Sequence, residues 1–331
     1  MEALGIINAM TQTPTQSPPA SSRLIYGCMG LGGGWNHDAL RSEDIAHAQA
    51  AVEAALDIGI TLFDHANIYT FGKAEQCFGE LFKLTPSLRQ RMQVQTKCGI
   101  RFADDSGPKR YDLSAAHIID AVHASLQRLH TDYIDVLLLH RPDPLMEPDE
   151  INLAWRTLKA AGKVRHLGVS NMHAGQLRLL AAGLQAPLVA NQLEMSLLKT
   201  DWLDADTCFN DGQSQSSLVW GDTLQYCQTQ NIGLQAWGAL GKGWYSGAAP
   251  RDAPPAVRAT ALLVQQLAQE YAVAPESIVL AWLLKHPARI QAVIGMAHPK
   301  RIRACADASR IALTREQWYA LYQSARGCEL P

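Results

Sequence analysis

The chain has 331 residues, of which 47% are hydrophobic and 18% are charged, with a formal net charge of -2. This balance is typical of a globular protein with a large core, and it gives no electrostatic reason to expect nucleic acid or a membrane surface as a partner. No apolar run is long enough to span a bilayer. Residues 1–22 lack the pattern of a secretion signal and are rich in Thr, Gln, Ser and Pro. We interpret 1–22 as a flexible leader and 23–331 as one domain.

The cysteines argue against a disulfide framework. There are seven of them, and no two have CxxC spacing, so a zinc site is equally unsupported. We therefore expect a reducing, cytoplasmic environment. Cys98 directly follows Lys97, and alternation along a strand turns the two side chains apart. We interpret Cys98 as a packing residue and not as a redox-sensitive thiol.

Strand-like and helix-like segments alternate from Arg23 to Arg326. The expected strands are Leu24–Cys28, Ile60–Phe63, Met92–Thr96, Ile134–Leu139, Val164–Val169, Pro187–Gln192, Ile232–Ala236 and Gln291–Ile294. The amphipathic helices expected between them are Ser42–Ile58, Lys73–Leu84, Ser114–His130, Pro148–Ala161, Ala174–Leu184 and Ser216–Gln230.

Such an alternation predicts a parallel α/β fold. Eight βα units over roughly 300 residues fit a closed (β/α)8 TIM barrel, which typically needs about 250. A doubly wound open sheet is the rival, because its strands are equally apolar on both faces. The longest irregular stretches, Thr200–Ser216 and Gly238–Ala256, each follow an expected strand. In a barrel they would be long loops over the active face.

The strongest functional signal is what ends each strand. The apolar run Ile60–Phe63 stops at Asp64, and a short polar turn delivers Tyr69 five residues later. The corresponding positions after later strands are Lys97, His140, Ser170, Asn171, Gln192, Trp237 and Gly295. In a barrel these ends meet at one rim, so residues far apart in sequence become neighbours. A single polar residue there is usually solvated or bonded to backbone, but a set of them indicates a site.

Asp, Tyr, Lys and His together fit general acid catalysis. A phenol has a pKa of about 10 and is a poor proton donor near neutrality unless it is perturbed. We expect the Lys97 ammonium to lower the pKa of Tyr69, and Asp64 to keep that ammonium charged. A histidine such as His140 can orient a carbonyl oxygen or relay a proton. Signatures of metal ligation, of a serine elbow, of a phosphate loop and of an active cysteine are missing from the sequence, so carbonyl reduction by an external hydride fits best.

These residues resemble one known family. The matching motifs are Gly59-Ile-Thr-Leu-Phe-Asp64-His-Ala-Asn-Ile-Tyr69, Thr96-Lys97, Leu137-Leu-Leu-His140, Gly168-Val-Ser170-Asn171 and Asn191-Gln192. In order and spacing they resemble the aldo-keto reductases from about Leu24 to the C-terminal helices. The run from His140 to Met146, HRPDPLM, is most similar to the bacterial predicted-oxidoreductase branch.

The resemblance implies a (β/α)8 barrel and NADPH as hydride donor. It implies a catalytic tetrad of Asp64, Tyr69, Lys97 and His140, in which Tyr69 is the acid. It also implies that Ser170, Asn171 and Gln192 hold the nicotinamide carboxamide. Trp237, where the family commonly has Tyr, would stack on the ring. Residues expected near the pyrophosphate and adenosine are Leu240, Gly241, Gly243, Gly295, Lys300 and Arg301.

The adenosine end departs from the family. Where the family often has Ile-Pro-Lys-Ser, Arg-Ile and Glu-Asn, this chain has Val293-Ile-Gly295-Met296, Arg301-Ile302 and Ala304-Cys305. Arg301 and Lys300 at a helix start can still meet a 2′-phosphate by charge and helix dipole. NADPH is therefore the expected cofactor, with NADH as the alternative.

Tryptophans in loops are candidates for the substrate pocket. Met29–Trp35 is glycine-rich, but Trp35 stands where a GxGxxG motif needs its third glycine. We therefore read this stretch as the first βα loop and expect Trp35 and Trp244 to line the pocket. Tyr245 is a further candidate, and Trp202 is expected to be ordinary packing.

The sequence thus predicts a cytoplasmic reductase of aldehydes or ketones with a small-molecule substrate, no metal, no nucleic-acid partner and no membrane attachment. The alternative is a regulatory subunit on the same barrel that senses NADPH with little turnover. The sequence does not indicate an oligomeric state.

Overall fold

The computed structural model describes residues 22–208 and 220–331. Its parallel strands close into a barrel in the order β1-β10-β9-β8-β7-β6-β3-β2. The strands are β1 (Leu24–Gly27), β2 (Leu62–Asp64), β3 (Gln93–Cys98), β6 (Ile134–Leu139), β7 (Val164–Ser170), β8 (Leu188–Glu194), β9 (Gly233–Trp237) and β10 (Gln291–Ile294). Each overlaps an expected strand, and the (β/α)8 barrel is confirmed. The open-sheet rival is wrong, because β1 pairs with β10.

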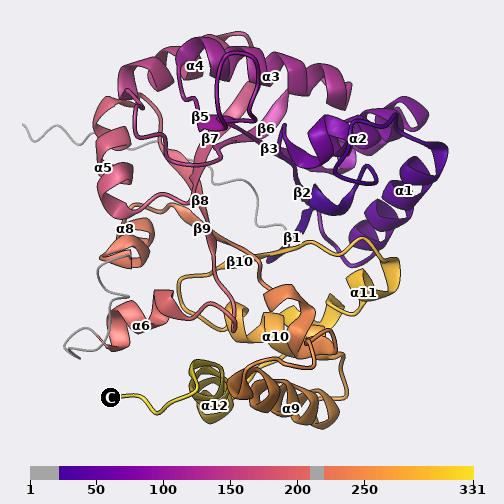
Figure 1. Cartoon of the computed structure of the whole chain (residues 1–331), viewed down its shortest axis with the longest axis vertical. Coiled ribbons are helices and arrows are strands. Elements are labelled where there is room, and N and C mark those ends of the chain that lie inside the picture. The colour runs from indigo at the N-terminus through magenta and orange to yellow at the C-terminus, as the bar shows by residue number, and fades with distance from the viewer. Residues whose placement is uncertain (1–21, 209–219) are drawn as a thin grey trace, which may run out of the picture.

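Helices surround the barrel as an outer ring (Figure 1). They are α1 (Ser42–Asp57), α2 (Lys73–Leu84), α3 (Ala115–Leu129), α4 (Pro148–Ala160), α5 (Ala174–Gly183), α6 (Asp201–Thr207), α8 (Thr223–Thr229), α9 (Pro255–Glu270), α10 (Pro275–Leu284), α11 (Pro299–Arg303) and α12 (Arg315–Arg326). Five of the six expected helices agree to within a residue at each end. The sixth, expected from Ser216, begins only at Thr223, and its residues 216–219 lie outside the described residues.

Two expected irregular stretches contain helix. Asp201–Thr207 forms α6, and a 3-10 helix covers Gly241–Ser246 within the second stretch. The expectation of structureless loops was wrong here because both helices are short and lack a long apolar stripe. Residues 209–216 of the first stretch and almost all of the expected leader, 1–21, lie outside the described residues.

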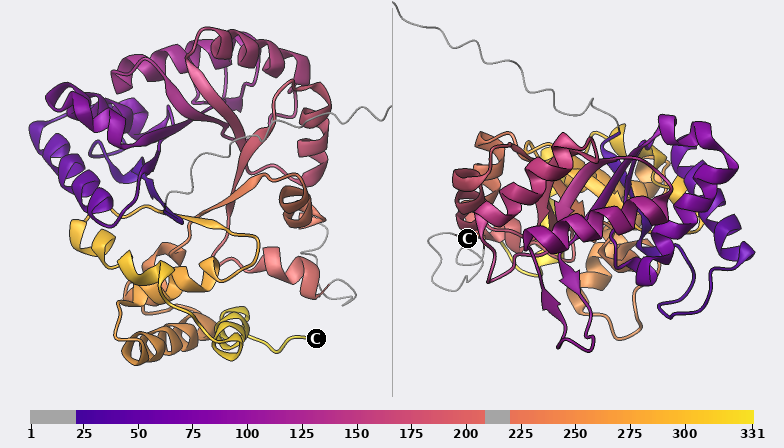
Figure 2. Two further views of the ribbon diagram at one scale, coloured as in Figure 1. Left: turned by 180° about the vertical axis from the view of Figure 1, so that it is seen from behind. Right: turned by 90° about the horizontal axis from the view of Figure 1, so that it is seen from above.

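A two-stranded hairpin was not expected. It pairs β4 (Ile100–Arg101) with β5 (Arg110–Tyr111) in antiparallel register directly after β3. The hairpin projects from the barrel in the right-hand view of Figure 2. Ion pairs stabilise it, with Arg101 Nη1 3.0 Å from Asp112 Oδ2 and Arg110 Nη1 3.1 Å from Asp104 Oδ1. Strands this short carry almost no periodicity, which explains why they escape detection in the sequence.

The strand β3 is clamped from outside by a buried carboxylate. Glu75 on α2 accepts a hydrogen bond from Thr96 Oγ1 at 2.6 Å and one from Arg128 Nε at 2.7 Å. Since side chains alternate along a strand, Thr96 faces the helices while Gln95 and Lys97 face the barrel interior. The clamp therefore fixes the strand that carries Lys97. No helix in the described part of the chain is both long enough and apolar enough to cross a bilayer.

Candidate active site

Four predicted residues from four segments meet at the C-terminal rim of the barrel. The Lys97 ammonium lies 2.7 and 2.6 Å from the two carboxylate oxygens of Asp64 and 2.9 Å from the carbonyl oxygen of His65. It also donates to the hydroxyl of Tyr69 at 3.1 Å. The ring of Tyr69 meets that of His140 edge to face, with centroids 6.0 Å apart. The structure thus brings all four predicted residues together.

A strained turn fixes the position of Tyr69. The next two residues, Thr70 and Phe71, have left-handed φ of 47° and 58°, a conformation that non-glycine residues rarely adopt. Thr70 Oγ1 donates to the carbonyl oxygen of Leu31 at 2.9 Å, which ties the turn to the loop after β1. The backbone of Asn67 donates to the carbonyl oxygen of Lys97 at 3.0 Å. Backbone strain held by surrounding contacts is typical of functional sites.

Burial and charge act in opposite directions on Lys97 and Tyr69. Burial is the largest single influence and disfavours the Lys97 ammonium, but the Asp64 carboxylate and the Tyr69 hydroxyl together outweigh it and raise the pKa of Lys97 above its ordinary value. Burial raises the pKa of Tyr69, and the nearby Lys97 only partly offsets it. The expectation of a lowered Tyr69 pKa was therefore wrong, because desolvation of the phenolate exceeds the attraction of the ammonium. Tyr69 stays protonated and lies beside a fixed positive charge.

His140 is held as a neutral imidazole. Burial, followed by the positive charges of Lys97 and Arg141, lowers the pKa of His140 to about 2. Its Nδ1 is buried and has no hydrogen-bond partner among the described residues. Its backbone N–H donates to the carbonyl oxygen of Cys98 at 2.9 Å, which anchors the strand end. A neutral imidazole can donate one hydrogen bond to a ligand oxygen without carrying charge.

The residues expected at the nicotinamide form a connected group. Ser170 Oγ donates to the carbonyl oxygen of Gln192 at 2.9 Å, and Asn171 Nδ2 donates to Ser170 Oγ at 2.7 Å. Trp237 Nε1 donates to Asn171 Oδ1 at 3.0 Å, which holds the indole beside these polar groups. All four lie at adjacent ends of β7, β8 and β9. A partly exposed aromatic face next to fixed amides and a hydroxyl fits a nicotinamide ring with its carboxamide.

The loop after β9 and the start of α11 also come together. Gly241 and Gly243 have left-handed φ of 53° and 76°. A Cβ on Gly243 would lie 3.1 Å from Arg301 Nη2, so the loop and the guanidinium are in close contact. Arg301 also lies 3.3 Å from Glu276 Oε1 on α10.

The other three residues expected at this end of the cofactor lie around the same turn. Leu240 precedes the turn, Lys300 is exposed beside Arg301, and a Cβ on Gly295 would meet open space. A basic side chain against a glycine turn fits a phosphate-bearing ligand.

The aromatic loop residues divide into exposed and buried ones. Trp35 is 51% exposed and packs edge to face on Phe71 with centroids 5.8 Å apart. Trp244 is partly buried under the Lys242 ammonium, which lies 5.2 Å from its ring.

Trp202 is buried, as expected for packing. Cys98 is also buried, and burial raises the pKa of its thiol to about 12. Tyr245 is buried as well, because it packs under Gly241, so it is not a wall of an open pocket.

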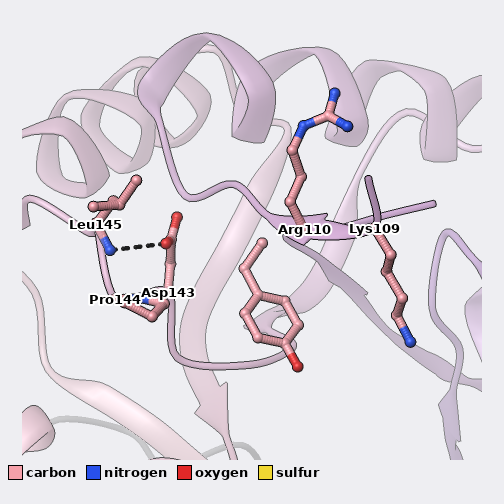
Figure 3. A pocket seen from close by; sticks show the side chains of 6 residues that line it. Lys109, Arg110, Asp143, Pro144 and Leu145 are labelled. Carbon is pink, nitrogen blue, oxygen red and sulfur yellow. Dashed lines mark hydrogen bonds between the residues drawn. The ribbon is translucent and has the colours of Figure 1, made fainter. Parts of the chain in front are cut away.

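An open hollow lies next to this rim. It has a volume of about 480 Å³ and lies between the hairpin and the loop after β6 (Figure 3). Its lining residues are Lys109, Arg110, Tyr111, Asp143, Pro144 and Leu145. The two segments follow β3, which carries Lys97, and β6, which ends directly before His140, but the hollow includes neither of those residues nor the two tryptophans expected at the substrate.

Sequence reasoning missed two buried glutamines, Gln95 and Gln235. Both lie inside strands, where the strand-end signal does not apply. Each precedes a predicted site residue by two positions, Lys97 and Trp237 respectively, and alternation puts such a pair on the same face. A glutamine two positions before a predicted site residue on the same strand was therefore the available signal. Among the described residues, no cluster of His, Cys, Asp or Glu is placed to hold a metal ion.

A closed barrel with an Asp-Lys-Tyr-His rim defines a class of oxidoreductase, and comparison with known proteins identifies the family. The model of the aldo/keto reductase family matches residues 23–326. The chain is 38% identical over 314 residues to a 6-dehydroglucose reductase of Agrobacterium fabrum strain C58, covering 93% of this chain and 96% of that protein. It is 34% identical to the oxidoreductase YdhF of Escherichia coli K12, covering 97% and 100% of the two chains.

The fold comparison agrees. The glycerol dehydrogenase AKR11B4 from Gluconobacter oxydans superimposes with a TM-score of 0.75 at 25% identity, covering 92% of this chain and 91% of that one. The chain therefore belongs to the aldo/keto reductase family and is an enzyme of that family.

Proposed function

We propose that this protein reduces the carbonyl group of an aldehyde or ketone to an alcohol, with NADPH as the cofactor and Tyr69 as the general acid. The observation that carries the proposal is the Tyr69 hydroxyl, which lies 3.1 Å from a buried ammonium that is itself paired with Asp64. As negative charge develops on a substrate oxygen, a protonated phenol beside a fixed positive charge can give up its proton to that oxygen.

The remaining residues have roles that follow from their positions. The neutral His140 orients the carbonyl oxygen through one hydrogen bond, and Asp64 keeps Lys97 charged. Ser170, Asn171 and Gln192 are assigned to the carboxamide, and Trp237 is assigned to the face of the ring. When bound, NADPH supplies the hydride that the protein's own side chains lack. NADH remains the alternative cofactor.

Four further assignments belong to the proposal. The glycine turn at Gly241 and Gly243 is assigned to the pyrophosphate and Arg301 to the 2′-phosphate. Trp35 and Trp244 are assigned to the substrate side of the rim. The protein is assigned to the cytoplasm, because a reducing compartment suits its free cysteines.

Tyr69→Phe tests the proposal. It removes the proton donor while keeping the ring, so turnover should fall by about 10²–10⁴-fold, the usual contribution of a general acid. The dissociation constant of NADPH, measured by isothermal titration calorimetry, should stay within about twofold, since the phenol is not assigned to cofactor binding. Tyr226→Phe on α8 is the matched control and should leave turnover unchanged. Retained turnover in Tyr69→Phe would contradict the assignment.

Substrates should be screened by following the loss of NADPH absorbance as the reduced nicotinamide is oxidised. The panel should include simple aldehydes, simple ketones and a sugar aldehyde, because one relative is named for reduction of 6-dehydroglucose. Tight NADPH binding without turnover of any member would favour the alternative, a sensing subunit on the same barrel.

A further inference from the structure

A chain of buried amides crosses the barrel interior from Asp64 to Gln192. Gln95 Nε2 lies 2.6 Å from Asp64 Oδ1 and 2.9 Å from Gln235 Oε1. Gln235 Nε2 returns a hydrogen bond to Gln95 Oε1 at 3.1 Å. Gln192 Nε2 then donates to Gln235 Oε1 at 3.0 Å. The three glutamines are 0%, 3% and 2% exposed in the order Gln95, Gln235, Gln192, so bulk water does not reach the chain.

The strand registers explain how this chain of buried amides is built. Asp64 pairs with Gln95 across β2 and β3, and Gln192 pairs with Gln235 across β8 and β9. The reciprocal bonds between Gln95 and Gln235 join the two pairs through the middle of the barrel, since β3 and β9 are not neighbours. The chain therefore links one side of the barrel, which carries the proton donor, to the other side, which carries the carboxamide residues.

The charge of Asp64 sets the direction of every amide in the chain. An ionised carboxylate only accepts hydrogen bonds, so Gln95 must turn its Nε2 toward Asp64. Its Oε1 is then left for Gln235 Nε2, and Gln235 Oε1 is left for Gln192 Nε2. Flipping any one amide would place an oxygen against an oxygen or an NH₂ group against an NH₂ group in a buried site. The polarity of the chain is therefore fixed from the carboxylate outward.

The last amide of this hydrogen-bonded series, that of Gln192, presents a hydrogen-bond acceptor. With Nε2 of Gln192 committed to Gln235, its Oε1 is the group that remains, and it accepts no hydrogen bond from the described residues. Of its two neighbours at the site, Ser170 donates its hydroxyl proton to the backbone carbonyl oxygen of Gln192, and Asn171 Nδ2 donates to Ser170 Oγ and to the carbonyl oxygen of His140. Gln192 Oε1 is thus placed to receive an N–H donor from a ligand.

We propose that Gln95 and Gln235 are positioning residues that transmit the polarity of Asp64 to Gln192, so that Gln192 Oε1 selects the NH₂ group of the nicotinamide carboxamide. Selection of the NH₂ end fixes which way the carboxamide points relative to the ring. This inference rests on the proposed cofactor, and it gives Asp64 a second task besides holding Lys97.

The test compares two cofactors that differ only at the group in question. In 3-acetylpyridine adenine dinucleotide phosphate a methyl group replaces the NH₂ of the carboxamide in NADP⁺. Both are titrated into the purified full-length protein by calorimetry. The wild type should bind NADP⁺ about tenfold more tightly, as expected when a buried acceptor loses its donor. In Gln95→Met and in Gln235→Met the ratio should fall toward one, although neither residue reaches the cofactor.

A second variant and a control separate positioning from simple stability. Gln95→Glu keeps the polarity while its acid is neutral, so its ratio should match the wild type at low pH and fall as the acid ionises. Thr96→Val removes a buried hydrogen bond from the adjacent, outward-facing position on β3. It should lower the melting temperature and leave the ratio unchanged.

The outcomes are distinct. If the wild type prefers NADP⁺ and both methionine variants keep the same ratio, the proposed role of Gln95 and Gln235 is overturned and the proposed function still stands. A constant ratio across pH in Gln95→Glu would also overturn it. Failure of the wild type to bind NADP⁺ at all would overturn both the proposed function and the proposed role of Gln95 and Gln235.

Discussion

The indole N–H of Trp237 donates to the side-chain oxygen of Asn171 across 3.0 Å. Asn171 itself has a left-handed φ of 60°, and its Nδ2 donates to Ser170 Oγ at 2.7 Å. One hydrogen bond therefore joins the aromatic ring assigned to the nicotinamide face to the polar groups assigned to the carboxamide. A Tyr hydroxyl would extend beyond the ring edge and cannot donate from the same place as the indole N–H.

Trp237→Phe should therefore weaken NADPH binding. The phenyl ring keeps a stacking face but leaves Asn171 Oδ1 without its donor, so the dissociation constant should rise by about tenfold. Calorimetry measures it directly. Trp155→Phe on α4 is the control for loss of a tryptophan far from the rim. Equal affinity in Trp237→Phe and the wild type would show that the hydrogen bond from Trp237 to Asn171 does not contribute to cofactor binding.

The ion pair between Lys97 and Asp64 should behave as a coupled unit. Lys97→Met leaves the Asp64 carboxylate buried without its cation, which costs about 3–5 kcal/mol of unfolding free energy. The double variant Asp64→Leu with Lys97→Met should lose less than the sum of the two single changes, because it leaves no unpaired charge. Urea unfolding gives each value. Lys83→Met, at an exposed ion pair, should change stability by less than about 1 kcal/mol. Strict additivity of the two buried changes would contradict this account.

The pH dependence of turnover should lack a histidine step. Since burial and neighbouring positive charge lower the pKa of His140 to about 2, the imidazole stays neutral throughout the working range. Tyr69 must be protonated to act as the acid, and its raised pKa keeps it so well beyond neutrality. Turnover in the reductive direction should therefore fall only at high pH. A plot of kcat against pH checks this, and an inflection near the ordinary histidine pKa of about 6.5 that vanishes in His140→Asn would contradict it.

His65 should make the protein sensitive to acid. It is fully buried against Phe78, neither ring nitrogen has a partner among the described residues, and burial followed by Lys97 lowers its pKa to about 3. The unfolded chain binds the proton more readily, so the contribution of His65 is present above its unfolded pKa of about 6.5 and is lost as pH falls toward 3.

His65→Leu should consequently reduce the pH dependence of stability. Between pH 6 and 4 the slope of unfolding free energy against pH should fall by about 1.4 kcal/mol per unit, the value for one proton. Urea unfolding at several pH values measures the slope. His123→Leu, at an exposed position on α3, is the matched control and should leave the slope as it is. An identical slope in His65→Leu and the wild type would mean that His65 takes up its proton in the folded state.

Arg301→Ala should raise the dissociation constant of NADPH more than that of NADH. The guanidinium lies beside the glycine turn and is only loosely held by Glu276 at 3.3 Å, so a phosphate could replace this partner. Arg303→Ala is the control, because Arg303 is equally basic but pairs with Asp57 on α1 at 2.8 Å. Equal changes for both cofactors would remove Arg301 from the 2′-phosphate.

The sequence predicted most of the barrel because the strands are short apolar runs separated by amphipathic helices. It also predicted the location of the candidate site, because the C-terminal ends of all the parallel strands of a barrel lie at one rim. Asp64, Lys97 and His140 were found this way without any knowledge of distances. Family resemblance added the roles but was not needed to see that these side chains converge.

Other features depend on packing that leaves no local trace. The left-handed turn at Thr70 and Phe71 has no glycine at those positions to signal it. The relation between Gln95 and Gln235 crosses the barrel over 140 positions of sequence, and only the strand register brings the two amides together. The direction of the Tyr69 pKa shift depends on the extent of burial, which cannot be judged from the presence of a nearby lysine.

The pairing of β1 with β10 has a consequence for how the protein becomes active. The register joins Leu24 to Ala292, so the barrel cannot close until nearly the whole chain has left the ribosome. Asp64 pairs with Gly27 of β1, and the turn after Tyr69 is tied to Leu31 just beyond it. Contacts as distant in sequence as the pairing of Leu24 with Ala292 form late in folding. The strand that carries Asp64 therefore reaches its final place only when β10 closes the barrel, and chains that lack β10 should be inactive.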